Sequence, residues 1–250
     1  MKKVIYLLCL SVFLFSCSDD DDTKKEVSLT MNFTHNWEGT TISSLGTSLD
    51  YTNANGENLS IERLRYLISN VTLRREGSSD IVLNGYNLVD VGEGTGLSYN
   101  PSTTISPGTY NLSFTFGFNN EDNQSGIYAD LNTANFNVPD MMGGGYHYMQ
   151  MDGKFMNSSN DETGYNFHAI RAVDNPGMNP TFPQDTFFTV NLGTVVLTDD
   201  STVEVQANIA EWFKNPNTWN LNTLHQMLMP NSNAQIMMYQ NGQDVFSLAQ

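Results

Sequence analysis

Apolar and polar residues alternate along several short stretches of the chain, and this pattern predicts half-buried β-strands. In residues 27–33 every second residue is apolar. The clearest stretch follows a turn signal at residues 106–109. There Tyr110, Leu112, Phe114, Phe116 and Phe118 alternate with polar or small residues.

Further short apolar segments, separated by polar and glycine-rich connections, extend this pattern towards the end of the chain. We expect strands at residues 65–73, 81–91, 146–151, 166–173, 187–197, 202–208 and 244–248. Segments 187–197 and 202–208 are expected to pair across a turn at 198–201. Short helical segments are expected at 59–64, 209–214 and 233–240, and long polar loops at 51–57 and 119–138. Many short strands between turn signals predict an all-β fold, a single β-sandwich-like domain of mainly antiparallel strands over residues 27–250.

The first residues have a different pattern. Lys2 and Lys3 precede an apolar run at 4–15, and Cys17 follows Leu14-Phe15-Ser16 and precedes four aspartates at 19–22. A basic start and a short apolar run are typical of a secretory signal. The cysteine context resembles the bacterial lipobox, and the acidic run resembles the export signal of Bacteroidetes lipoproteins.

This resemblance implies a lipoprotein signal peptide at 1–16, lipidation of Cys17 and an acidic tether at 17–26. It also implies anchoring in the outer membrane, with the domain displayed at the cell surface or otherwise at the periplasmic face. An ordinary cleaved signal followed by a solvated acidic linker is the alternative.

The amino-acid composition and the absence of known motifs exclude several classes of function. The only two cysteines are Cys9 and Cys17, so the body of the protein would contain no thiol or disulfide. The net charge of −16 becomes −16 − 2 = −18 once Lys2 and Lys3 are removed. Such acidity argues against nucleic-acid binding. The chain contains no P-loop, G-x-S-x-G or H-E-x-x-H motif, and we therefore expect a binding protein and not an enzyme.

The four histidines, His35, His147, His168 and His225, carry the candidate chemistry. On a strand at 146–151, alternation would place His147, Met149 and Met151 on one face. His168 is expected on a neighbouring strand, and Asp152 or Asn166 could fix the tautomer of a ligating imidazole. Imidazole and thioether ligands together suit copper. Histidines that satisfy internal hydrogen bonds, and methionines that fill gaps in a core, are the structural alternative.

Six sequence blocks, in order along the chain, resemble the MbnP-like family of extracytoplasmic copper-binding proteins. The blocks are 33–35 with 51–56, 61–73, 105–117, 143–154, 167–168 and 211–213 with 227–246. The resemblance implies an all-β copper-binding domain and a partner, a di-haem peroxidase-like protein that can oxidise a family tryptophan to kynurenine. Here Met141, Met142 and glycines stand in place of the tryptophan-containing segment, so the resemblance predicts no kynurenine there.

For a copper site, His147 and His168 are the first candidates and His35 the next. His225 and Met149 are weaker candidates, and a methionine ligand would favour the cuprous ion. A surface module that binds glycans or proteins without metal remains open. Exposed tyrosines on polar loops, Tyr99, Tyr128 and Tyr165, would then supply the contacts.

Overall fold

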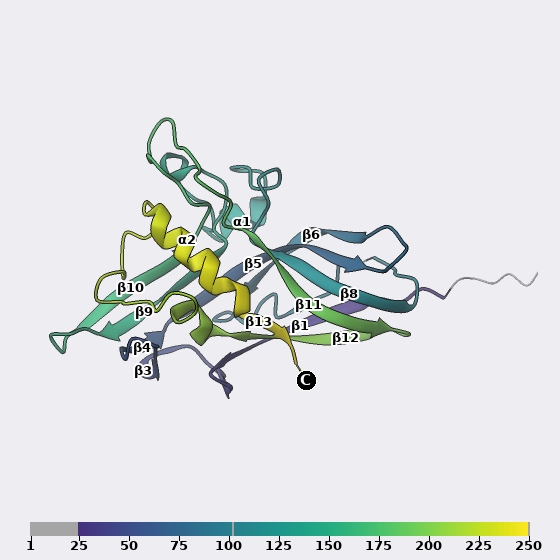
Figure 1. The fold of residues 1–250 in the computed structure, drawn as a ribbon, viewed down its shortest axis with the longest axis horizontal. Coiled ribbons are helices and arrows are strands. Elements are labelled where there is room, and N and C mark those ends of the chain that lie inside the picture. Colours follow the sequence, from purple (N-terminus) through teal and green to yellow (C-terminus); the bar gives the residue numbers. More distant parts are fainter. Residues whose placement is uncertain (1–24, 102, 250) are drawn as a thin grey trace, which may run out of the picture.

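Two β-sheets form most of the computed structural model, which describes residues 25–101 and 103–249 (Figure 1). The strands are β1 (Leu29–Trp37), β2 (Thr40–Thr41), β3 (Gly46–Thr52), β4 (Asn58–Ile61), β5 (Arg63–Arg74), β6 (Ile81–Asp90), β7 (Ser98–Tyr99), β8 (Gly108–Phe116), β9 (Met149–Met156), β10 (Glu162–Ala169), β11 (Phe188–Leu197), β12 (Ser201–Asn208) and β13 (Phe246–Leu248). The helices are α1 (Ala129–Thr133) and α2 (Ser232–Asn241), with 3-10 turns η1 (Asp140–Met142), η2 (Ile209–Phe213) and η3 (Gly242–Asp244).

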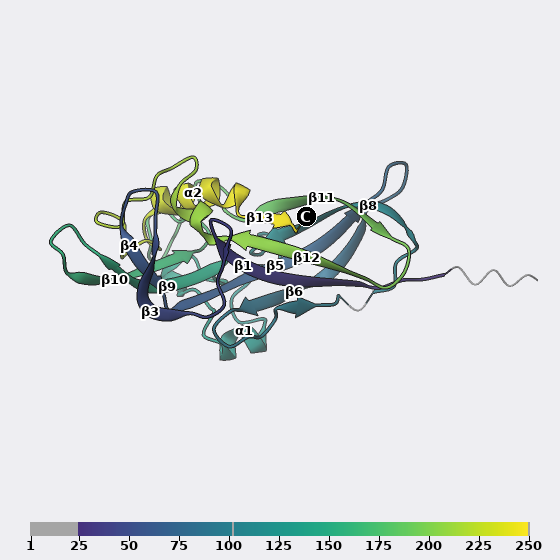
Figure 2. The ribbon, with the colours of Figure 1, turned by 90° about the horizontal axis from the view of Figure 1, so that it is seen from below.

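The smaller sheet has the strand order β13-β12-β1-β2, with β7 also paired to β1. The larger sheet has the order β11-β8-β5-β9-β4-β3, with β6 added to β5 and β10 to β9. Strands β1 and β12 pair in parallel, and the other strand pairs among the described residues are antiparallel. The predicted all-β sandwich is confirmed. In Figure 2, α1 and α2 lie on opposite sides of these strands.

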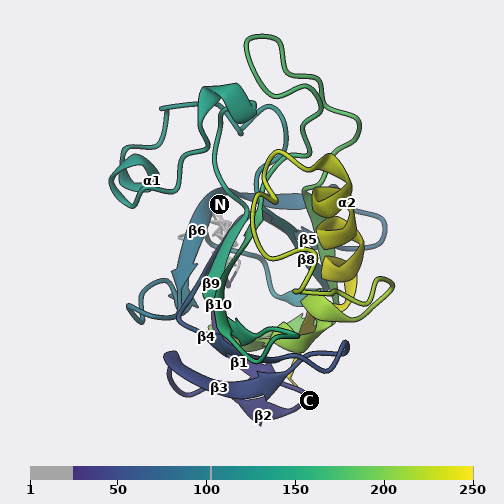
Figure 3. The ribbon, with the colours of Figure 1, turned by 90° about the vertical axis from the view of Figure 1, so that its left-hand side faces the viewer.

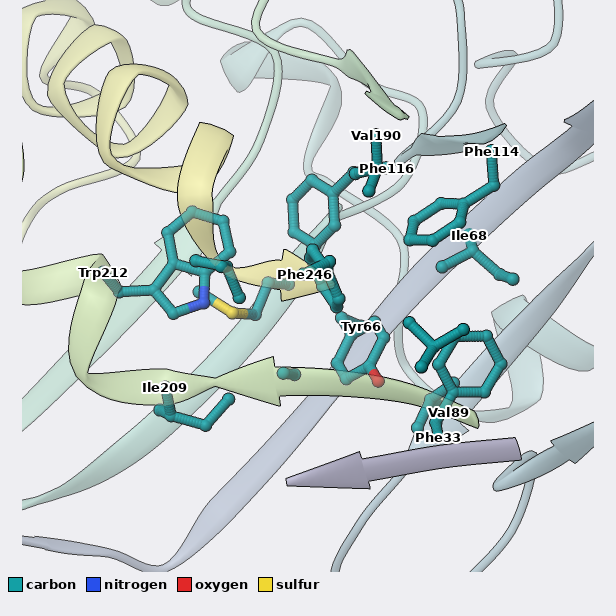
Figure 4. Close-up of a cluster of buried hydrophobic side chains, with 14 of the residues drawn as sticks. Phe33, Tyr66, Ile68, Val89, Phe114, Phe116, Val190, Ile209, Trp212 and Phe246 are labelled. Atoms are coloured by element: carbon teal, nitrogen blue, oxygen red, sulfur yellow. The ribbon is translucent and has the colours of Figure 1, made fainter. Parts of the chain in front are cut away.

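Aromatic side chains fill the space between the sheets (Figure 4). The predicted alternation of β8 is confirmed, because Tyr110, Leu112, Phe114 and Phe116 are all buried. The Phe116 ring stacks on Phe188 from β11, with 4.9 Å between ring centroids. Each fully buried aromatic of this size contributes roughly 1.5–3 kcal/mol relative to an exposed one, so this contact network contributes strongly to stability.

Three local predictions are wrong. Segments 187–197 and 202–208 do form strands, but they pair in different sheets, β11 with β8 and β12 with β1. Residues 59–64 are extended and not helical, because Leu59 lies opposite Phe155 of β9. Tyr165 lies on β10 and is buried, with its hydroxyl donating to the Ser60 carbonyl at 2.7 Å, so it offers no exposed contact. The predicted helices near 209–214 and 233–240 are confirmed as η2 and α2.

The long irregular connections gather on one side of the sheets. Residues 117–148 and 170–187 lie side by side there, as Figures 1 and 3 both show, and the Gly177 amide donates to the Met141 carbonyl at 2.7 Å. The segment leading into α2 reaches the same side, where Met229 packs near Met142 and Phe182. Within the described residues no helix is both long and apolar enough to cross a membrane.

A buried carboxylate holds the long segment between η2 and α2 against the sheet. Glu57, in the turn between β3 and β4, accepts five hydrogen bonds of 2.7–3.1 Å from Asn53, Asn55, Leu221 and Asn222. Burial favours its neutral form, but these hydrogen bonds outweigh that effect and lower the pKa of Glu57. The ionised carboxylate is therefore a structural anchor for Leu221 and Asn222.

We predict that Glu57→Gln lowers the free energy of unfolding at pH 7 by about 2–3 kcal/mol, since hydrogen bonds to an ionised group are lost and an amide group faces the donors. Because the folded pKa lies below the ordinary value of 4.5, this stabilisation is complete above that pH and is lost as the pH falls through the folded pKa. Urea unfolding at several pH values measures both effects. Exposed Glu76→Gln is the control, and equal stability of the two variants would refute the anchor.

Candidate metal centre

The segment before β9 makes a tight turn that three consecutive glycines permit. Glycines 143–145 have φ values of +98°, +67° and +74°, in the left-handed region. A Cβ atom on these residues would lie 2.4–2.7 Å from the side chains of Phe182, Ser125 and Asn123. The turn therefore packs closely against residues 119–126 and 182, and it delivers His147 to the start of β9.

The register between β9 and β10 decides which side chains face outward. His168 pairs with Gln150, and Asn166 pairs with Asp152. The intervening residues, Phe167 and Ala169 on β10 and Met149 and Met151 on β9, are buried in the main core. Gln150, Asp152, Asn166 and His168 therefore share the outer face of the two strands.

His147 joins this outer group. Its ring centroid lies 5.3 Å from that of His168, and the two rings are nearly perpendicular at 85°. The predicted common face for His147, Met149 and Met151 is wrong. Tyr148 and Met149 are consecutive residues that both enter the main core, so alternation is interrupted between them and His147 lies on the opposite side from both.

Hydrogen bonds fix the tautomers of both imidazoles. Nδ1 of His147 donates to the Phe136 carbonyl at 2.9 Å, and this leaves Nε2 as a lone-pair nitrogen. That Nε2 is buried without a hydrogen-bond partner, and His147 is only 4% exposed. Nε2 of His168 donates to Asp152 Oδ1 at 2.8 Å, so Nδ1 carries the lone pair when this ring is neutral. Two imidazoles that share an ion at about 2.0 Å from each nitrogen have ring centres roughly 6 Å apart or less, a limit that this pair meets.

The surroundings lower the pKa of both His147 and Asp152, so the imidazole is neutral and the carboxylate is ionised at neutral pH. Burial, helped by the charges of His168, Arg65 and Arg63 and opposed by the hydrogen bond to Phe136, lowers the pKa of His147 to about 4. Burial alone would raise the pKa of Asp152, but the hydrogen bond and charge of His168, together with Asn166 and Arg63, bring it to about 2. Asp152 is thus an ionised acceptor that orients His168 and offsets the nearby positive charge.

The other predicted ligands lie elsewhere. Nε2 of His35 lies 3.0 Å from the Tyr66 hydroxyl inside the core, where burial lowers its pKa to about 4. His225 donates from Nδ1 to the Leu221 carbonyl at 3.0 Å, and its ring packs against Phe155. Met149 is part of the main core. Across residues 25–101 and 103–249 there is no preformed group of three or more His, Cys, Asp or Glu side chains suited to a metal. Cys17 lies outside the described residues.

A pocket of about 360 Å³ opens beside His168, formed mainly by segments in which the sequence pattern predicts no site. It is lined by Met142, Asn166, His168, Met227, Leu228, Met229 and Pro230, and we call it the methionine pocket. The pairs Met141-Met142 and Met227-x-Met229 are visible in the sequence, but the first lies in the single 3-10 turn η1 and the second in an irregular segment. No periodicity could therefore assign their side chains to a face.

Comparison with known proteins identifies the family. The sequence profile of the family described as MbnP matches residues 26–238. The chain belongs to the MbnP family. Among solved structures, MbnP from Methylosinus trichosporium has a similar fold, with a TM-score of 0.55 and 13% sequence identity over 77% of this chain and 79% of that one. A search of curated proteins found no match. The MbnP family is linked in general to copper handling outside the cytoplasm.

Burial sets the pKa of His147 in the metal-free protein, and the hydrogen bond to Phe136 sets its tautomer. Its midpoint should lie near pH 4, and at pH 5.5 the ring should be the neutral Nδ1–H tautomer, whereas an ordinary histidine is mostly charged there. Because the folded pKa is lowered, the unfolded chain takes up this proton first, and stability falls as the pH drops from about 6.5 towards 4. Side-chain 15N NMR, with His147→Asn to assign the signal, tests this. A midpoint near 6.5 would contradict it.

Proposed function

We propose that this MbnP-family protein binds a copper ion between His147 and His168 and serves in copper acquisition or handling. The observation that carries the proposal is the buried, unpartnered Nε2 of His147 beside a second imidazole. A buried nitrogen without a partner costs about 1–3 kcal/mol, and a metal ion would supply the missing partner.

The groups around the two rings also suit a metal. Ligating histidines commonly donate their second nitrogen to a carbonyl or a carboxylate, and His147 and His168 have one acceptor of each kind, Phe136 and Asp152. Imidazole is a good ligand for copper. Arg63 and Arg65 lie close enough to act on His147, so a singly charged ion is easier to accommodate than a doubly charged one.

The same proposal includes a place and a partner for the protein. The sequence around Cys17 supports a lipid anchor in the outer membrane, with the domain exposed at the cell surface or facing the periplasm. The family resemblance supports a di-haem peroxidase-like partner. The proposed role is binding and not catalysis. Trp37, Trp212 and Trp219 are all buried in the main core, which supports a site made without a modified tryptophan.

Copper affinity should depend on the pair and on its carboxylate. We expect the purified protein to bind close to one equivalent of Cu(I), and His147→Ala or His168→Ala to lose at least 100-fold in affinity. Asp152→Asn should lose roughly 10- to 100-fold, since it removes the group that orients His168. Competition with a chromophoric Cu(I) chelator measures each value.

His225→Ala is the matched control for these variants, because His225 packs against Phe155 and is expected to leave affinity unchanged. Urea unfolding checks that every variant is folded. Equal affinity in His147→Ala and the unmodified protein would move the site elsewhere, and the absence of any retained copper would overturn the proposed function.

A second pocket supports the alternative role in glycan binding. Its volume is about 490 Å³, and it combines three aromatic rings with amide and carboxylate groups: Tyr86, Phe118, Tyr128, Asn70, Asn84, Asn119, Glu121 and Asp122. Flat rings beside polar side chains suit a sugar face. On this alternative, an oligosaccharide retained on a glycan array would be lost in Tyr128→Ala and kept in His147→Ala. Binding to no glycan would remove the alternative.

A further inference from the structure

Sulfur is concentrated in the methionine pocket beside His168. Three of its seven lining residues are methionines, Met142, Met227 and Met229, in a chain with 12 methionines among 250 residues. His168 lines the same pocket and also contacts His147, so it connects the pocket to the buried imidazole. The pocket thus adjoins the site assigned above to copper.

These methionines are held in place by the fold. The buried side chain of Gln235, on α2, donates to the carbonyls of Leu228 at 3.0 Å and His168 at 2.9 Å, and it accepts from the Ile170 amide at 2.8 Å. This one side chain ties the segment carrying Met227 and Met229 to the end of β10. Met142 lies at the end of η1, on the turn that also delivers His147.

Packing against the buried cluster of Val138, Ile170 and Val173 accounts for Met142 and Met229, but not for Met227. Met31, Met151 and Met238 are fully buried gap-fillers, whereas Met227 is 76% exposed. Met227 also has a φ of +56°, a left-handed conformation that is uncommon for a bulky side chain. Such outliers persist where the surrounding structure imposes them, often at ligand sites. An exposed apolar residue in this conformation gains little from the hydrophobic effect.

Thioether chemistry indicates the ligand. A methionine sulfur is a soft, neutral donor that selects Cu(I) over harder ions and needs no deprotonation. We propose that Met142, Met227 and Met229 form a first binding site for Cu(I), from which the ion passes to His168 and His147. The inference rests on the proposed copper function and adds to it a thioether site through which Cu(I) enters. The ion changes ligands without gaining or losing an electron.

Methyl NMR tests the proposal directly. The protein is labelled with 13C-methyl methionine and titrated with Cu(I), which is diamagnetic. We expect the resonances of Met142, Met227 and Met229 to shift. The same shifts are expected in the double variant His147→Ala/His168→Ala, because its pocket retains the sulfur atoms. The triple variant Met142→Leu/Met227→Leu/Met229→Leu keeps volume and apolarity and removes only sulfur. It should take Cu(I) from a chelator at least tenfold more slowly and keep its Cu(II) affinity.

Met141→Leu/Met178→Leu is the matched control, because these methionines are 58% and 97% exposed and do not line the pocket. It should load Cu(I) at the unmodified rate. Two results would overturn this inference and leave the proposed function standing. One is copper bound by the histidines with no shift of the three methyl resonances. The other is an unchanged loading rate in the triple variant. An unmodified protein that binds no Cu(I) would overturn both the inference and the proposed function.

Discussion

The pairing of β9 with β10 is the constraint on which the candidate site depends. Because side chains alternate across a strand, this register sends Phe167 and Ala169 into the core and turns Asn166 and His168 outward, opposite Asp152 and Gln150. A shift of one residue would exchange the two sets, and the large apolar cost of exposing Phe167 prevents it. The same burial that stabilises the sandwich thereby fixes His168 and its carboxylate on one face.

The second imidazole reaches this face through a local exception to alternation. Glycines 143–145 allow a turn that L side chains rarely adopt, and Tyr148 and Met149 then enter the core in succession. His147 is left buried beside His168, with one nitrogen satisfied by Phe136 and the other without a partner. The aromatic core is large enough to tolerate that unpaired nitrogen in the free protein. A ligand that satisfies it would stabilise the fold by roughly 2.7 kcal/mol at 100 times its dissociation constant.

Sequence reasoning captured what periodicity controls. The alternation from Tyr110 to Phe116 predicted β8, and the pairing of His147 with His168 as first candidates matches their proximity in the structure. The sequence pattern did not predict which strands pair, because long-range packing determines that. The turn at 198–201 resembles a hairpin, yet β11 and β12 join different sheets, because β12 pairs in parallel with β1.

The positions of side chains in the irregular segments could not be predicted from the sequence pattern either. Met227 and Met229 follow no period, and long-range hydrogen bonds, among them those of Gln235, bring them beside His168. His35 and His225 could not be separated from His147 by residue type, since each is a lone histidine near a strand or loop. Their partners, the Tyr66 hydroxyl and the Leu221 carbonyl, became known only from the fold.

The central claim is that His147 and His168 bind one copper ion. Anomalous diffraction at the copper absorption edge, from crystals of the Cu(I)-loaded protein, tests it most directly. The account predicts one strong anomalous peak between the two rings, within bonding distance of His147 Nε2 and a nitrogen of His168. A peak at His35 or His225, or loaded crystals with no ordered peak at this pair, would contradict it.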